Sequence, residues 1–286
     1  MKIFLTGSTS YLGTKFVDIY GNKFDIFGVS FHDEVNPIDL LDKQKLTDVF
    51  KQFNPDVIVH LAADLGRDIT TTDKITKTNP EIVENLVELA LPNKTPFIFT
   101  SSEAVYGGKW DEGDYSETDN LEPRNPYGMS KVIAEKILVD SGLPYLITRG
   151  HRYVGIPSKR FDKAKQFPDT IKNIVNGNVV HLDSKKIFCP VLINNICDII
   201  NHYIESDLGK KVLINMGINK KTTYFDFVSD VVHVIGLDKD LLKSDGDEAG
   251  WPNNSSLNMN KMIELGYPSV NYEDLIRIIA LEFKEL

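Results

Sequence analysis

The chain has 286 residues, of which 42% are hydrophobic, and it carries a formal net charge of −9 at pH 7. This length is sufficient for one large domain or two closely joined ones with a full core. The acidic balance argues against nucleic acid as the main partner, because binding phosphates needs clustered lysines and arginines. Only two cysteines are present, which excludes a disulfide framework and a zinc spacing.

No stretch approaches the roughly 18 apolar residues of a membrane span. The apolar run after Met1 ends at Thr6-Gly7, too early for a secretory signal. We therefore expect a cytoplasmic protein with no membrane partner. No metal site is expected either, because four histidines show no ligand spacing: His60, His181, His202 and His233.

Short apolar runs alternate with helical patterns in the first half of the chain, which is typical of a parallel α/β sheet. The expected strands are 2–6, 26–30, 57–61, 97–100 and 145–149. The expected helices are 11–20, 41–53, 80–91 and 126–140. Pro126 suits the first turn of the last helix, where its missing N–H costs no hydrogen bond.

After Gly150 the alternation weakens. Helices are expected at 165–176, 191–204, 224–235 and 271–283, and a strand at 211–215. The sequence thus predicts an α/β fold: a Rossmann-type doubly wound parallel sheet with a smaller C-terminal α/β substrate-binding region. The dinucleotide-binding domain is expected to cover 1–154, with a return of 191–217 to the sheet. The substrate-binding region would cover 155–190 and 218–286.

Tyr127 and Lys131 form a Tyr-x-x-x-Lys pair, and Ser102 follows an expected strand. Residues four apart share a helix face, so the lysine charge would favour phenolate and lower the tyrosine pKa from its usual value of about 10. A serine hydroxyl can donate a second hydrogen bond to the substrate oxygen. The trio predicts a carbonyl/alcohol redox centre that uses a nicotinamide dinucleotide.

A glycine turn follows the first strand. Residues 6–13 match Thr-Gly-x-x-Gly-x-x-Gly, except that Ser10 replaces the middle glycine. Gly7 would allow the tight turn and Gly13 the close helix–strand packing, while the helix N-terminus would present N–H groups to a diphosphate. The expected cofactor contacts here are Gly7, Ser10, Tyr11, Leu12 and Gly13.

The end of the second strand normally carries an acid in NAD-binding sites. Ser30 and His32 stand there instead, and no arginine is nearby in the sequence for a 2′-phosphate. The expected cofactor is therefore NADP or NAD. A slight preference for NADP rests on Ser30 and His32, although Asp33 and Glu34 would repel the phosphate and a plain loop role for His32 stays open.

With these motifs in view, the chain resembles the extended short-chain dehydrogenases/reductases, and within them the dTDP-4-dehydrorhamnose reductase branch, over nearly its whole length. The matching segments are Asp39-Leu40, 55–63, Asn79, 102–107, the Tyr127/Lys131 pair and 251–258, where Trp251 replaces an arginine. The resemblance implies further cofactor contacts at Asp39, Leu40, Leu61, Ala62, Ala63 and Asn79. It also implies that Lys131 holds the nicotinamide ribose beside Tyr127.

The resemblance also argues against two of the reactions that related enzymes catalyse. Related dehydratases carry Asp-Glu after the catalytic serine or threonine, whereas this chain has Glu103-Ala104. Related epimerase-reductases use a nearby cysteine, and none lies between Ser102 and Lys131. The residues expected to face the substrate are Ser102, Glu103, His151 and Arg152.

The expected function is NAD(P)H-dependent reduction of a nucleotide-linked 4-keto-6-deoxy sugar in carbohydrate biosynthesis, an oxidoreductase activity. Two alternatives stay open: an NAD-dependent nucleotide-sugar 4-epimerase and a non-catalytic regulatory member of the same fold. The partner would be a small nucleotide sugar, and a homodimer is one option for the assembly.

Overall fold

The computed structural model describes residues 1–31, 36–65, 72–109, 111–161, 166–245 and 253–284. Its centre is a six-stranded sheet in the order β10-β5-β4-β3-β1-β2, and every neighbouring pair in it is parallel. The strands are β1 (Lys2–Thr6), β2 (Asp25–Val29), β3 (Val57–His60), β4 (Phe97–Thr100), β5 (Tyr145–Gly150) and β10 (Lys211–Met216).

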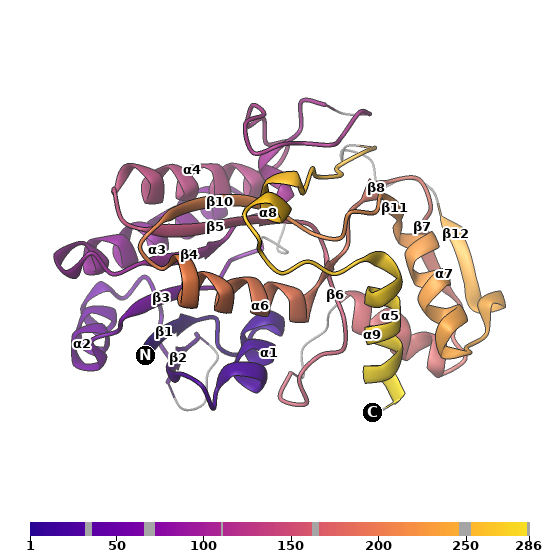
Figure 1. Cartoon of the computed structure of the whole chain (residues 1–286), viewed down its shortest axis with the longest axis horizontal. Helices are drawn as coiled ribbons and strands as arrows, with labels where there is room; N and C mark the ends of the chain where they lie inside the picture. The colour runs from indigo at the N-terminus through magenta and orange to yellow at the C-terminus, as the bar shows by residue number, and fades with distance from the viewer. Residues whose placement is uncertain (32–35, 66–71, 110, 162–165, 246–252, 285–286) are drawn as a thin grey trace.

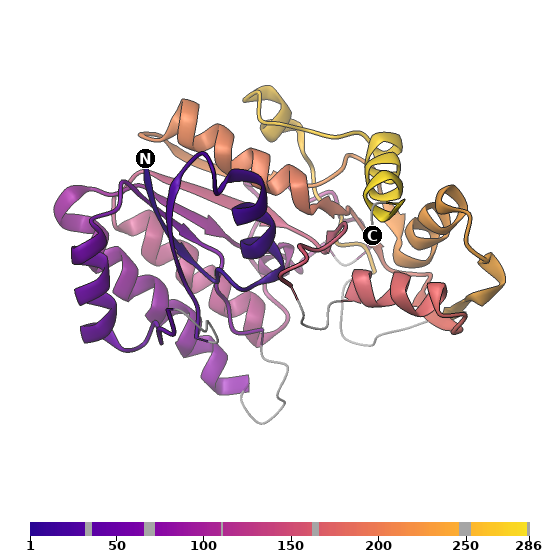
Figure 2. The same ribbon diagram turned by 90° about the horizontal axis from the view of Figure 1, so that it is seen from below.

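Helices cover both faces of this sheet (Figures 1 and 2). One face packs against α1 (Tyr11–Tyr20) and α6 (Ile193–His202), which is followed by a π-helical turn at Tyr203–Asp207. The other face packs against α2 (Lys43–Phe53), α3 (Thr72–Ala90) and α4 (Pro126–Asp140). The predicted doubly wound Rossmann-type class is therefore confirmed.

Alternate residues of each strand enter the two cores. In β1, Ile3 and Leu5 pack towards α1 and α6, while Phe4 between them packs towards α2 and α3. All three side chains are completely buried. Burial on both faces explains why these strands read as continuous apolar runs in the sequence.

The strand order reverses between β1 and β3. The crossover through α1 leads to β2 on one side of β1, and the crossover through α2 leads to β3 on the other side. In open parallel sheets, ligands bind outside the carboxyl ends of the strands at such a point. The chain places Gly7 at the end of β1 and Leu61 at the end of β3, so this edge is the expected cofactor site.

The second half of the chain builds a smaller α/β layer beside the sheet, with its own apolar core (Figure 1). Three two-stranded pairs join β12 with β7, β11 with β8, and β6 with β9. These strands are β6 (Tyr153–Val154), β7 (Val180–Asp183), β8 (Ile187–Phe188), β9 (Val191–Leu192), β11 (Thr222–Thr223) and β12 (Leu242–Asp245). The helices are α5 (Gln166–Val175), α7 (Tyr224–Ile235) and α9 (Tyr272–Lys284), while α8 (Asn260–Glu264) packs on the main core beside β10.

Short 3-10 turns complete the described elements, at Leu91–Asn93, Glu103–Val105 and Lys239–Leu241. Within the described residues, no helix is long and apolar enough to cross a membrane.

Helix α9 returns to the start of the chain. Lys15 in α1 lies 3.0 Å from the Glu282 carboxylate in α9, and its Nζ also donates to the Ile156 carbonyl at 3.2 Å. Asn194 at the start of α6 donates to the same Glu282 oxygen at 2.8 Å. The Tyr11 hydroxyl donates to the Gly155 carbonyl at 2.6 Å. These contacts join the first helix to the second half of the chain.

Two predicted elements differ from the structure. Helix α3 begins at Thr72 rather than at Pro80, so the proline lies inside it. Burial of Ile75 and Asn79 holds the turns before the proline, which offsets the backbone hydrogen bond that proline cannot make. The segment predicted as one helix over 191–204 starts with strand β9, because a short apolar run does not distinguish strand from helix.

Gly13 allows α1 to approach β1, and it supplies a test of the predicted turn. A Cβ at Gly13 would lie 2.1 Å from the Gly7 carbonyl oxygen, a backbone atom that cannot rotate away. We expect Gly13→Ala to lose about 1–3 kcal/mol of stability in urea unfolding, the usual cost of overpacking. Gly209→Ala is the control, because no atom lies within 4 Å of its added Cβ. Equal stability of the two variants would contradict the close packing.

Candidate active site

Helix α4 carries Tyr127 in its first turn. Asn125 caps the helix, since its side chain accepts from the Gly128 N–H at 2.7 Å, and Pro126 follows it. Gly128 lets the helix approach the segment after β4, because a Cβ there would lie 2.1 Å from the Ala104 carbonyl oxygen. This approach brings Tyr127 beside Ser102.

Ser102 follows the end of β4 and caps the short turn Glu103–Val105. Its hydroxyl accepts from the Ala104 N–H at 3.2 Å and donates to the Glu103 carboxylate at 2.6 Å. The side chain also interacts with the Tyr127 phenol. The serine of the predicted trio is therefore placed against both the tyrosine and an acid.

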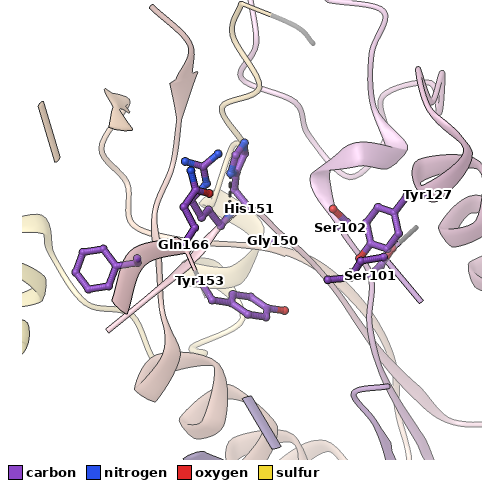
Figure 3. A pocket seen from close by; sticks show the side chains of 10 residues that line it. Ser101, Ser102, Tyr127, Gly150, His151, Tyr153 and Gln166 are labelled. Carbon is purple, nitrogen blue, oxygen red and sulfur yellow. Dashed lines mark hydrogen bonds between the residues drawn. The ribbon is translucent and has the colours of Figure 1, made fainter. Parts of the chain in front are cut away.

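Ser102 and Tyr127 line a cavity of about 220 Å³. Figure 3 shows them together at one end, with His151, Tyr153 and Gln166 towards the other. The remaining lining residues are Leu65, Ser101, Gly150, Arg152 and Phe167. The cavity therefore combines the carboxyl ends of β4 and β5 with the start of α5.

The Tyr127 phenol is held neutral in the free protein. Its pKa is raised well above the usual 10, first because the group loses hydration and second because the Glu103 carboxylate is close. The interaction with Ser102 acts in the opposite direction. The sequence predicted a lowered tyrosine pKa from the neighbouring lysine, and the structure gives the reverse for the free protein.

Lys131 is 2% exposed and lies beneath the cavity wall. Its Nζ donates to the Thr100 carbonyl at 2.8 Å and lies 4.6 Å from the Phe99 ring centre and 5.6 Å from that of Tyr127. Burial lowers its pKa to about 7, partly offset by Glu135. The free lysine therefore keeps only part of its charge at neutral pH.

A buried ion pair lies behind the trio. Arg149 donates to both oxygens of Glu135, from Nε at 3.0 Å and from a terminal nitrogen at 2.6 Å. Both side chains are 4% exposed. Ser101 donates to Glu135 at 2.5 Å, and Arg149 reaches Tyr106 at 2.7 Å. Arg149 therefore has a structural partner inside the protein.

His151 and Arg152 form part of the opposite wall. The Arg152 backbone N–H donates to His151 Nδ1 at 2.7 Å, and His151 Nε2 lies 2.8 Å from the Ser255 hydroxyl. The Arg152 guanidinium stacks on Tyr224, 4.4 Å from its ring centre. This stacking holds a positive charge at the cavity, which Arg152 lines.

The glycine turn has the shape that a dinucleotide requires. Gly7 has a φ of +73°, and a Cβ there would meet the Ala62 backbone nitrogen at 2.8 Å. Ser10 caps α1 by accepting from the Gly13 N–H at 3.0 Å, so the serine that replaces the middle glycine has a local role. Both glycines therefore let backbone segments pack closely, since a Cβ at Gly13 would meet the Gly7 carbonyl oxygen at 2.1 Å. A diphosphate at this turn and at the N-terminus of α1 stays a prediction.

The other predicted cofactor residues lie around this turn. Leu61 is buried beside it, and the Ala62 and Ala63 side chains are half-buried. Ser30 accepts from the Thr9 hydroxyl at 2.9 Å, Asp39 is exposed, and Leu40 lies in the core. Tyr11 and Leu12 are buried in the first turn of α1. His32 lies outside the described residues.

Asn79 connects α3 to α4. Its side chain donates to the Ser130 hydroxyl at 3.0 Å and to the Asp64 carbonyl at 2.9 Å. Ser130 precedes Lys131, so the asparagine holds the helix that carries the lysine. Contact with the cofactor itself stays a prediction for this residue.

Sequence reasoning missed several residues of the site. Tyr153 and Gln166 line the cavity, and Glu135 anchors it from behind. Only Glu135 had a usable signal, since it lies one helical turn beyond Lys131 on the same face. Tyr153 and Gln166 come from a region without clear periodicity, where the sequence did not predict which side chains face inward.

The fold is of the dinucleotide-binding type, and it brings a tyrosine, a lysine and a serine to the carboxyl edge of its sheet. These features place the protein among the NAD(P)-dependent oxidoreductases of the extended short-chain dehydrogenase/reductase type. The family model for NAD-dependent epimerases/dehydratases matches residues 3–191, so the chain belongs to this family. The resemblance inferred from the sequence is confirmed, and with it the expectation of a nicotinamide cofactor.

Individual proteins are similar over the whole chain. The probable low-salt glycan biosynthesis reductase Agl14 of Haloferax volcanii is 24% identical, with 100% of this chain and 99% of the relative covered. The structure of dTDP-4-dehydrorhamnose reductase from Bacillus anthracis, in complex with NADP, has a TM-score of 0.85 at 19% identity, covering 98% and 99% of the two chains. UDP-glucose 4-epimerase from Thermotoga maritima, with UDP-glucose, has a TM-score of 0.85 at 21% identity, covering 100% and 99%. At these identities the solved structures establish the shared fold.

The depressed lysine pKa predicts a pH-dependent stability. The Lys131 pKa is about 7 in the folded protein, against about 10.5 in an unfolded chain. Between these values the unfolded chain binds the additional proton, so the free energy of unfolding rises with pH. From about pH 7 to about pH 9.5, the wild type should gain melting temperature relative to Lys131→Met. The exposed neighbour variant Lys136→Met is the control and should follow the wild type.

The buried ion pair predicts a large loss of stability on removal of one partner. Arg149→Met leaves the Glu135 carboxylate buried without its cation, and we expect a loss of about 3–5 kcal/mol in urea unfolding. Arg277→Met removes an arginine that is 70% exposed in its ion pair with Asp274, and it should change stability far less. A small effect at both positions would contradict a strongly stabilising pair between Arg149 and Glu135.

Proposed function

We propose that the protein is an NAD(P)H-dependent reductase of a nucleotide-linked 4-keto-6-deoxy sugar. The observation that carries this proposal is the state of Tyr127, a neutral phenol beside Ser102 at the wall of the cavity. Reduction of a ketone needs a proton donor at the oxygen that becomes the alcohol. An oxidation would first need a base at the same position, which burial and the nearby Glu103 carboxylate disfavour by raising the pKa of the phenol.

The side chains of the protein supply the proton and position the substrate and the cofactor. When bound, NAD(P)H supplies a hydride to the keto carbon. Ser102 donates a hydrogen bond to the substrate oxygen and stabilises the negative charge that develops there. Tyr127 gives its phenolic proton to that oxygen as general acid. Lys131 is proposed to hold the nicotinamide ribose and to favour the resulting phenolate.

The nucleotide sugar as substrate class is supported by the family and by the charge distribution. Agl14 and the dTDP-4-dehydrorhamnose reductase are similar to the chain over its full length. Arg152 presents a guanidinium at the cavity wall, where it would meet a diphosphate or a sugar hydroxyl. Glu103 and His151 are the proposed contacts to the sugar.

NADPH is proposed as the preferred donor. The hydroxyls of Thr9 and Ser30 lie 2.9 Å apart at the end of β2, where the ribose of a dinucleotide is bound in this fold. Hydroxyl donors suit a 2′-phosphate, whereas an acid would suit the free ribose hydroxyls. The NADP complex of the similar Bacillus anthracis reductase agrees with this preference.

An NAD-dependent 4-epimerase is the second candidate, because the Thermotoga maritima epimerase is as similar in fold as the reductase. Such an enzyme would purify with tightly bound NAD and would consume no reduced cofactor. A non-catalytic regulatory member would bind the cofactor and turn over no keto sugar.

The reductase proposal is tested with dTDP-4-dehydrorhamnose and NADPH or NADH, by following the loss of reduced-cofactor absorbance. Tyr127→Phe should retain cofactor affinity in a thermal-shift titration and lose about 10²-fold or more in rate, because it removes the general acid. Unchanged turnover in this variant would eliminate the mechanism. Bound NAD in the purified wild type without NADPH consumption would instead identify the epimerase.

A further inference from the structure

The Ser102 hydroxyl has one proton, and in the free protein that proton is directed to Glu103. Ser102 Oγ lies 2.6 Å from Glu103 Oε2, and it accepts from the Ala104 N–H at 3.2 Å. An ionised carboxylate can only accept hydrogen bonds, so the serine is the donor in the contact with Glu103. The hydroxyl proposed to donate to the ketone oxygen is therefore already donating to an acid.

Turning this proton to a ketone oxygen takes a donor away from the Glu103 carboxylate. The Glu103 side chain is only 14% exposed, so water has limited access to replace the donor. A carboxylate that loses a hydrogen bond in such a place is destabilised, because bonds to charged groups are among the strongest in proteins. Another group must therefore donate to Glu103 when Ser102 turns to the substrate.

His151 is the other side chain seen to approach this carboxylate in the described part of the chain, with Nε2 at 3.5 Å from Glu103 Oε1. The Arg152 backbone N–H donates to Nδ1, so a neutral imidazole carries its proton on Nε2. That proton goes to the Ser255 hydroxyl at 2.8 Å, because Ser255 in turn donates to the Ile187 carbonyl at 3.2 Å. Burial lowers the pKa of His151, although Glu103 acts in the opposite direction. The imidazole therefore has no proton left for the carboxylate.

The substrate itself is then the source of the missing donor. Ser102 and His151 both line the cavity (Figure 3), and the Glu103 carboxylate lies between them. A ketone oxygen that accepts from Ser102 is thus next to the oxygen from which the serine proton has turned. A hydroxyl on the carbon beside the carbonyl has the same neighbouring arrangement of two oxygens, so it can reach the carboxylate from that position.

We propose that Glu103 makes the site selective for ketones that carry a hydroxyl on the neighbouring carbon. The substrate hydroxyl donates to the Glu103 carboxylate in place of Ser102, and the released Ser102 hydroxyl donates to the ketone oxygen. Hydrogen bonds are exchanged in this step, and no proton or electron is transferred. In a 4-keto-6-deoxy sugar this group is the hydroxyl on C3, because C5 carries the methyl group. The selectivity rests on the proposed reductase function.

The test compares dTDP-4-dehydrorhamnose with its 3-deoxy counterpart, each reduced with NADPH. The wild-type kcat/KM should be about 10²-fold lower for the deoxy ketone, the scale of one lost hydrogen bond to a charged group. In Glu103→Leu, Ser102 has no carboxylate to leave and the C3 hydroxyl has none to meet, so this ratio should fall below about 10. The loss of rate in this variant should be larger for the hydroxy ketone than for the deoxy ketone.

Three further variants separate this selectivity from a general loss of activity. Tyr127→Phe should slow the reduction of both ketones by the same factor, because the general acid serves either of them. Glu264→Leu, at an exposed position in α8, should leave both rates and their ratio unchanged. Glu103→Gln keeps the side-chain shape and an uncharged acceptor, so its ratio should lie between those of the wild type and Glu103→Leu.

A second measurement needs no hydride transfer. Protein loaded with NADP⁺ or NAD⁺ can hold a keto sugar without reducing it, so calorimetric titration gives its affinity for both ketones. The hydroxy ketone should bind to the wild type about 10-fold or more tightly than the deoxy ketone, and Glu103→Leu should bind the two alike.

The outcomes distinguish the selectivity from the reductase function. Equal wild-type kcat/KM values for the two ketones, or a ratio that Glu103→Leu leaves unchanged, would overturn the selectivity and leave the reductase in place. No oxidation of reduced cofactor, together with a difference in affinity that depends on Glu103, would overturn the reductase and retain the selectivity. Failure of the wild type to bind either ketone would overturn both.

Discussion

Glu135 accepts hydrogen bonds from Arg149 and Ser101 inside the protein, and this charge cluster joins α4 to the ends of β4 and β5. Arg149 extends it through the Tyr106 hydroxyl to the Asn215 side chain in β10. A buried charge is tolerated only when its partners are fixed, so the cluster restricts how these elements can shift. Ser102 and Lys131 each lie one step from its members, and their relative position depends on it.

The region around Tyr127 also keeps the charges of Lys131 and Glu103 apart. Lys131 lies below the Tyr127 ring and loses part of its charge through burial, while Glu103 stays at the cavity side. Burial and the charge of Lys131 also lower the pKa of His60 to about 3, so that histidine is neutral beneath the sheet edge. The free site therefore favours uncharged phenol. Any cofactor charge near Lys131 would shift this balance, which couples cofactor binding to the reactivity of the tyrosine.

Local patterns were enough to predict the parallel sheet, the glycine turn and the elements that carry Ser102, Tyr127 and Lys131. Each of these depends on residues close in sequence: a strand end, a helix spacing or a turn. The approach of α4 to Ala104 depends on Gly128. The sequence alone did not indicate that the glycine after Tyr127 allows this close packing. The pairing of Glu135 with Arg149 and the contact of His151 with Ser255 join residues far apart in the chain.

The direction of the Tyr127 pKa shift could not be predicted for a related reason. Spacing places the lysine on the same helix face, but it gives neither the burial of that lysine nor the nearness of Glu103. Short apolar segments such as Val191–Leu192 were also ambiguous, because pairing with β6 decides their conformation.

The contact of Lys15 with Glu282 has a consequence for how the protein is made. Helix α1 is translated well before its partner in α9, because Lys15 and Glu282 are 267 residues apart in the chain. Until α9 has been made, the lysine beside the glycine turn has no carboxylate to meet. A growing chain should therefore hold this turn without its ion pair until α9 has left the ribosome.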